Sequence, residues 1–197
     1  ASAEPLFLKY AKRFISLAAP EVPLEARKEL LRLSKQYEGF SVASFTSGEL
    51  RDAFTRDMLS MVDLLAINID EAASLLGLDS PGDTPEQLVQ MTIARMREIH
   101  PSTMLSVTAG KSGSWTWDGN VLNYVPAFAV EVKSSAGAGD AHIAGIMSGL
   151  TAGLTLAEAQ KLAGLAAAFS VTSPHTIHPE MSRENLRALA ARVPERT

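Results

Sequence analysis

Residues 130–145 read VEVKSSAGAGDAHIAG, and in this stretch small residues join an alternating apolar run to a helical pattern. The run Phe128–Val132 ends at the small residues, and from Ala141 apolar side chains recur at helical spacing. A helix N-terminus has backbone N–H groups without intrahelical partners and a partial positive charge. Because Gly137 and Gly139 lack Cβ, their backbone can come close to a bound anion. The stretch therefore predicts a loop that binds phosphate or a developing oxyanion.

Asp140 does not suit a loop that only binds anions, because its carboxylate would repel phosphate. It suits a general base that takes the proton from a hydroxyl as that hydroxyl attacks the phosphate. In the simpler interpretation, Asp140 only caps the helix and the glycines only form a tight turn. The GxGD string alone leaves both interpretations open.

The composition of the 197 residues is that of an ordinary globular protein, with 46% hydrophobic and 20% charged residues. The net charge of −4, without a run of Lys or Arg, argues against a nucleic-acid partner. Four His and no Cys exclude disulfides and a thiolate metal site, and His175 and His178, in a loop flanked by prolines, are expected at the surface rather than on a metal. No apolar run is long enough to span a bilayer, so we expect a soluble, cytoplasmic protein without a membrane partner.

Strand-like and helix-like segments alternate along the chain, which predicts a single α/β domain over residues 1–197 with a mostly parallel sheet between helices. A Gly119-Asn120 turn predicts an antiparallel hairpin near residues 113–125. The expected strands are 14–19, 40–45, 62–68 and 103–108, and the expected helices are 24–37, 48–61, 71–76, 85–98, 140–152, 156–171 and 182–191.

Asn68 and Glu71 follow a nearly continuous apolar run, residues 62–67, of the kind that forms a strand buried on both faces of a parallel sheet. Open α/β sheets place their ligands at the carboxyl ends of such strands. Taken alone, however, the pair is better explained as a capping box at the start of the next helix.

Two strings imitate known nucleotide-binding motifs. Residues 110–112, Gly-Lys-Ser, match the end of a P-loop, but Leu105 stands where that motif requires glycine. Residues 137–139 could open a dinucleotide fingerprint, but its third glycine position is His142. A dinucleotide-dependent oxidoreductase is therefore not favoured.

Three strings occur in a characteristic order: Asn68-x-x-Glu71, then Thr108-x-Gly110-x-x-Gly113, then Gly137-Ala138-Gly139-Asp140. In this the chain resembles the ribokinase-like family of sugar and nucleoside kinases, also called the PfkB carbohydrate kinase family. The resemblance implies a three-layer α/β fold and transfer of the ATP γ-phosphate to a hydroxyl of a sugar or nucleoside. It also implies that Asp140 is the catalytic base and that Gly137, Ala138 and Gly139 form the anion hole with their backbone N–H groups.

The same resemblance implies a nucleotide site and a metal site. Thr108, Gly110 and Gly113 would line the phosphates or ribose of ATP, with Lys111 adding positive charge. Asn68 and Glu71 would organise Mg²⁺ and its waters near the phosphates. Residues 168–174 would border the adenine pocket.

The chain departs from the family pattern in two ways. Ser134-Ser135 replaces an Asp-Thr pair whose Asp belongs to a monovalent-cation site in several members, which puts a potassium requirement in doubt. By the same resemblance, the N-terminal strands and the lid, which in the family carry most sugar contacts and often pair into homodimers, would be absent. We therefore expect the C-terminal part of a kinase, with an incomplete acceptor pocket and little activity by itself. The alternative is a non-catalytic nucleotide-binding or regulatory module of the same fold.

Overall fold

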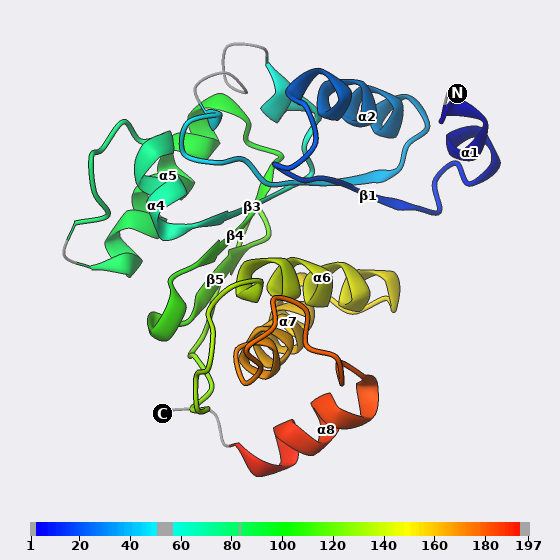
Figure 1. The fold of residues 1–197 in the computed structure, drawn as a ribbon. Helices are drawn as coiled ribbons and strands as arrows, with labels where there is room; N and C mark the ends of the chain where they lie inside the picture. Colours follow the sequence, from blue (N-terminus) through cyan, green and yellow to red (C-terminus); the bar gives the residue numbers. More distant parts are fainter. Residues whose placement is uncertain (1–2, 51–56, 83, 194–197) are drawn as a thin grey trace. The chain divides into compact units, whose positions relative to one another are not determined.

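The computed structural model describes residues 3–50, 57–82 and 84–193, which form two compact units. The first unit comprises Ala1–Val107 with Trp117–Val121, and the second comprises Thr108–Thr116 with Leu122–Thr197. Figure 1 shows the helices and strands of each unit. The single domain expected over residues 1–197 stays a prediction.

The strands of the first unit follow chain order across its sheet. They are β1 (Ile15–Ala18), β2 (Phe40–Ala43), β3 (Leu64–Asn68) and β4 (Met104–Thr108). Parallel pairing joins β1 to β2 and β2 to β3. In β3 the residues before Asn68 are at most 3% exposed. This burial confirms the prediction of a strand covered on both faces, whose polar carboxyl end alone reaches solvent.

Helices of the first unit begin and end near their predicted positions. Pro23 precedes α2, Asn68 is the N-cap of α4, and Pro85 opens α5. In Figure 1, α2 lies against the ribbon of β1 and β2. The helices are α1 (Glu4–Lys9), α2 (Leu24–Gln36), α4 (Ile69–Leu75) and α5 (Pro85–Ile99).

The helix expected over residues 48–61 is described only in part, because residues 51–56 lie outside the described ranges. Its end is the short 3₁₀-helix η1 (Met58–Met61), which begins after Asp57 in a left-handed conformation with φ +55°. A left-handed residue cannot continue an α-helix, so the described part corrects the prediction of one continuous helix up to residue 61.

The second unit contains three long helices and the predicted hairpin apart from Trp117–Val121, which belong to the first unit. A buried amide joins hairpin and helix: Gln160 of α7 donates to the Ser114 carbonyl at 2.7 Å and lies 2.7 Å from the Thr116 hydroxyl. The elements are η2 (Gly110–Ser112), β5 (Ser114–Trp117), β6 (Leu122–Val125), α6 (Ala138–Thr151), α7 (Leu156–Ser170) and α8 (Arg183–Arg192).

Helices α6 and α7 lie against each other over most of their lengths (Figure 1). Glycines of α6 permit this approach. A Cβ on Gly145 would lie 2.5 Å from Cα of Ala163, and a Cβ on Gly149 would lie 2.6 Å from Cβ of Ala159. Both distances are too short for a Cβ on either glycine. The two backbones can approach this closely because small residues face each other.

Residues 126–137 form neither strand nor helix. The alternation from Phe128 to Val132, typical of a strand, here belongs to an extended segment that pairs with no strand. Phe128 packs so closely on α7 that a Cβ on Gly164 would lie 3.1 Å from its ring. Phe128 is therefore used for packing beside α7 and not for a sheet.

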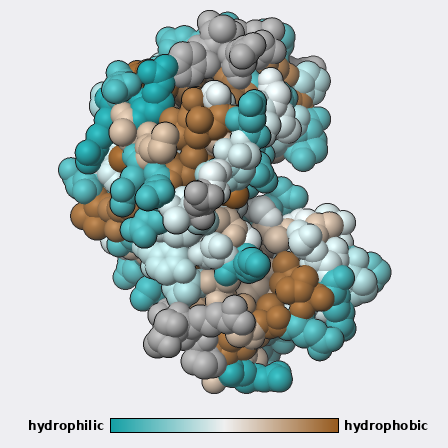
Figure 2. Space-filling model, turned by 90° about the vertical axis from the view of Figure 1, so that its left-hand side faces the viewer, coloured by the Kyte–Doolittle hydropathy of each residue, from teal (hydrophilic) through white to brown (hydrophobic). Residues whose placement is uncertain are grey.

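Among the described residues, no helix combines the length and the apolar character that a bilayer crossing requires. Figure 2 shows hydrophobic residues in several brown patches set among polar ones on one face. Exposed apolar side chains include Leu8, Val132 and Ile177, with Ile177 82% exposed.

Replacing Gly145 with Ala should lower the free energy of unfolding by about 1–3 kcal/mol, because the added methyl collides with the α7 backbone. The cost of this collision should exceed the stabilisation of about 1 kcal/mol that Ala normally gives over Gly in a helix interior. Urea unfolding followed by circular dichroism measures the change.

Gly48→Ala is the matched control, because a Cβ at Gly48 would have no atom within 4 Å. It should change the free energy of unfolding by less than about 0.5 kcal/mol. Equal stability of the two variants would show that α6 and α7 can move apart at no cost.

Candidate functional site

The glycine loop leads directly into α6. Gly137 is the N-cap, with φ +80°, and the helix begins at Ala138, so Asp140 is its third residue. Asp140 therefore does not cap the helix, which corrects the simpler interpretation of this carboxylate. It is exposed, and no described residue forms a hydrogen bond or ion pair with it.

Gly137 cannot be replaced by a residue with a side chain. Its φ lies in the left-handed region, and a Cβ would lie 2.1 Å from the carbonyl oxygen of Thr176. The end of α7 also contacts this loop, because the Lys133 and Ser134 N–H groups donate to the Val171 carbonyl at 2.8 and 3.3 Å. Residues after α7 thus fix the path of the loop.

Three backbone N–H groups at the start of α6 have no acceptor among the described residues: those of Gly137, Gly139 and Asp140. The N–H of Ala138, also predicted for the anion hole, donates to the Ser135 carbonyl at 3.3 Å. Unpaired N–H groups at the N-terminus of a 14-residue helix form a favourable environment for an anion.

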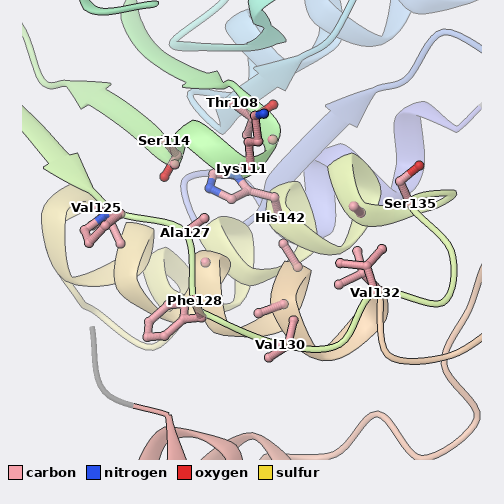
Figure 3. Close-up of a pocket in the computed structure, with 18 of the residues that line it drawn as sticks. Thr108, Lys111, Ser114, Val125, Ala127, Phe128, Val130, Val132, Ser135 and His142 are labelled. Carbon is pink, nitrogen blue, oxygen red and sulfur yellow. The ribbon is translucent and has the colours of Figure 1, made fainter. Parts of the chain in front are cut away.

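A cavity of about 490 Å³ lies within the second unit beside this loop. Figure 3 shows Thr108, Lys111 and Ser114 on one side and the segment from Val125 to Val132 on the other. Thr108, Gly110, Lys111 and Gly113, all predicted to bind nucleotide, line it together with Ala138 and Gly139. The structure therefore brings together residues from two of the three sequence strings.

The turn after β4 forms the polar side of the cavity. Residues 110–112 form the 3₁₀-helix η2 and lead into β5 rather than into an α-helix, so they are not a P-loop. Gly113 has φ +90°, and a Cβ there would lie 2.4 Å from the Val125 carbonyl oxygen. This glycine is needed where the turn meets the strand β6. Lys111 is exposed.

The apolar side of the cavity was largely missed from sequence. It comes from residues 125–132 and from α7, with Gly164, Ala167, Ala168 and Val171. Of the segment 168–174 expected near adenine, Ala168 and Val171 line the cavity. Because residues 126–132 lack regular structure, their spacing gave no sign of which side chains face a ligand.

His142 is a further lining residue that the sequence did not single out as a site residue. It is 3% exposed, and its Nε2 has no hydrogen-bond partner. Burial lowers the pKa of His142 to about 4, because the charged imidazolium would lose its hydration. The ring is therefore neutral at neutral pH.

Asn68 and Glu71 lie in the first unit and form the predicted capping box. The Glu71 N–H donates to Asn68 Oδ1 at 2.9 Å, and the Asn68 N–H donates to Glu71 Oε2 at 2.8 Å. Burial raises the pKa of Glu71; the hydrogen bond from Asn68 opposes this shift, and the charges of Asp70 and Glu49 add to it. The capping role is confirmed, whereas a metal role stays a prediction.

The described residues contain no group of three or more His, Cys, Asp or Glu that could enclose a metal ion. His175 is exposed, whereas His178 is half-buried, and its ring stacks on Phe169 with centroids 4.2 Å apart. A Mg²⁺ ion that is held by one carboxylate, phosphates and waters needs no such group. The partly buried, hard oxygen donor Glu71, close to other negative charges, fits an ion of that kind.

The chain is similar to known proteins in both sequence and fold. The family model of the pfkB family carbohydrate kinases matches residues 4–183. The uncharacterized sugar kinase YegV of Escherichia coli (strain K12) is 29% identical over 127 residues, which are 63% of this chain and 37% of that protein. The structure of adenosine kinase from Sinorhizobium meliloti has a TM-score of 0.76 at 21% identity and covers 97% of this chain and 57% of that one. Ribokinase from Cryptococcus neoformans var. grubii serotype A, solved in complex with ADP, has a TM-score of 0.72 at 24% identity, with 90% and 60% covered.

The chain thus spans 37% of the length of that curated relative and 57% and 60% of the two solved chains. The likeness in fold confirms the predicted ribokinase-like α/β class.

Glu71→Gln should raise the free energy of unfolding at pH 7. Gln can keep the capping box, and it removes a carboxylate whose folded pKa is raised. A carboxyl whose pKa is raised by folding makes the wild type less stable as the pH rises and the group ionises. The difference in free energy of unfolding between the variant and the wild type should therefore shrink at pH 4. Urea unfolding at both pH values measures it.

Glu86→Gln serves as the control, since Glu86 is an exposed first-turn residue of α5. Its free energy of unfolding at pH 7 should fall by a few tenths of a kcal/mol, because the substitution removes a favourable charge from the helix N-terminus. This change is opposite in sign to that expected for Glu71→Gln. A Glu71→Gln protein less stable than the wild type at pH 7 would contradict the prediction.

Proposed function

The chain belongs to the pfkB family of carbohydrate kinases, and we propose that it forms the nucleotide-binding and catalytic part of an ATP-dependent phosphotransferase. In this proposal the γ-phosphate of ATP is moved to a hydroxyl of a sugar or nucleoside. The observation that carries it is the exposed carboxylate of Asp140 beside unpaired N–H groups at the start of α6. That carboxylate has no structural partner among the described residues, and binding an anion gains nothing from it.

Asp140 acts as the general base. As the acceptor oxygen bonds to the γ-phosphorus, the bond from that phosphorus to the bridging oxygen breaks, ADP leaves, and the hydroxyl proton passes to Asp140. The N–H groups of Gly137 and Gly139, with that of Ala138 after it leaves Ser135, stabilise the charge on the transferred group.

The cavity of the second unit takes the nucleotide. Its apolar side suits a flat heterocycle, whereas Thr108, Gly110, Lys111 and Gly113 lie on its polar side and suit ribose and phosphates. The similar ribokinase from Cryptococcus neoformans was solved with ADP, which supports a nucleotide ligand.

Asn68 and Glu71 are proposed to organise Mg²⁺ and its waters. Their capping bonds occupy Asn68 Oδ1 and Glu71 Oε2, so the second carboxylate oxygen of Glu71 remains available. When bound, Mg²⁺ neutralises charge on the phosphates. A homodimer of the full-length protein and a cytoplasmic location stay predictions.

Asp140→Asn should lower the rate of phosphate transfer by at least about 10²-fold, because an amide cannot accept the proton. Nucleotide affinity should remain, because this substitution leaves the backbone N–H groups of the loop in place. A coupled assay of ADP release with a panel of sugars and nucleosides, on the full-length protein, gives the rate, and calorimetry gives the affinity.

Glu184→Gln is the matched control, because it also removes a carboxylate from an exposed first-turn position of a helix, α8. It should change neither the rate of phosphate transfer nor the affinity for nucleotide. An unchanged rate of phosphate transfer in Asp140→Asn would contradict the role of Asp140 as the general base. A wild type that binds ATP without transferring phosphate to any acceptor would favour the non-catalytic nucleotide-binding module.

A further inference from the structure

His142 lies two residues after Asp140 and projects from α6 between the two sides of the cavity (Figure 3). It is 3% exposed, and its Nε2 has no hydrogen-bond partner among the described residues. A ring nitrogen buried without a partner costs about 1–3 kcal/mol. Native structures contain few such groups, so the exception requires an explanation.

The other buried polar side chains nearby are satisfied. Gln160 contacts the Thr116 hydroxyl and donates to the carbonyl and the hydroxyl of Ser114. In the described part of the second unit, Nε2 of His142 is the one buried side-chain nitrogen or oxygen without a partner. The buried side-chain nitrogens and oxygens described in this unit therefore have hydrogen-bond partners except Nε2 of His142, a residue that lines the cavity.

The chemistry of the ring limits what could complete it. Because burial holds the pKa of His142 at about 4, the imidazole is neutral and offers one donor and one acceptor. A neutral ring adds no charge for phosphate, whereas Lys111 and the unpaired N–H groups at the start of α6 serve that purpose. A neutral donor and acceptor pair matches the edge of a nucleobase or a ribose hydroxyl.

The ring can turn to meet such a ligand. Rotation about the Cβ–Cγ bond of His has a broad energy profile, so the ring can change its orientation to meet a ligand in the cavity. Val125 and Phe128 provide apolar surface on the same cavity for the faces of a planar base.

We propose that His142 is a specificity-determining residue whose imidazole hydrogen-bonds the nucleoside part of the bound nucleotide and not its phosphates. The inference rests on the proposed nucleotide site and adds to it the residue that recognises the uncharged half of the ligand. His142 is not assigned any part in the proton transfer.

The test compares two ligands in His142→Phe, which keeps a ring of similar size and removes both nitrogens. Calorimetry with adenosine and with inorganic tripolyphosphate separates the two halves of the nucleotide. The affinity for adenosine should fall at least about tenfold, the loss of one buried hydrogen bond, and the affinity for tripolyphosphate should change less than about twofold. The urea midpoint should not fall, because the variant removes an unpaired buried nitrogen.

His142→Gln should recover part of the adenosine affinity, since its amide can donate and accept. His175→Phe makes the same exchange at an exposed histidine and should bind adenosine like the wild type. If His142→Phe lowers the urea midpoint, its fold is impaired, and His142→Leu is used as the apolar variant in its place.

Equal adenosine affinity in the wild type and the apolar variant would overturn the inference and leave His142 as a packing residue. A wild type that binds tripolyphosphate but not adenosine would also overturn it, while the anion-binding loop of the proposed function would stand. A wild type that binds neither ligand would overturn both.

Discussion

The second unit depends on the approach of α6 to α7, which only small residues permit. Gly145 and Gly149 allow the two backbones to touch, so the position of α6 is fixed along its length by Ala163 and Ala159. The first turn of α6 carries the unpaired N–H groups and Asp140. A site that places charge within fractions of an ångström requires a rigid support, and here close helix packing provides it.

The polar groups proposed to bind ligands contrast with those that hold the fold together. Gln160 is buried and fully paired, whereas Asp140 is exposed without a partner, His142 is buried without one, and Glu71 keeps a carboxylate under burial and negative neighbours. Each of the last three would be more easily satisfied by a bound ligand or ion than by the protein alone. Functional residues often carry such a stability cost.

Much of the architecture could be predicted from sequence because it follows local rules. The buried run of β3, the capping box of Asn68 and Glu71, and the small-residue loop before α6 each have a signature within a few residues. The end of the helix expected over 48–61 was wrong, because Asp57 takes a left-handed conformation that residue type does not reveal. The family resemblance is confirmed, whereas the roles of Asp140, Lys111 and Glu71 stay predictions.

Other features depend on contacts between distant residues. Residues 128–132 alternate like a strand, yet they have no regular structure and Phe128 packs on α7, and no spacing rule reports that. The missing partner of His142 likewise emerges only when the cavity around it is known. A sequence pattern describes one segment at a time, whereas a cavity wall is assembled from several.

The contact between Gly137 and the Thr176 carbonyl has a consequence for how the chain can vary. It joins backbone to backbone, so the side chain at position 176 can be exchanged while the contact persists. Lengthening or shortening the connection between α7 and α8 by one residue would instead displace the carbonyl. Related chains should therefore differ freely in the composition of this connection and preserve its length.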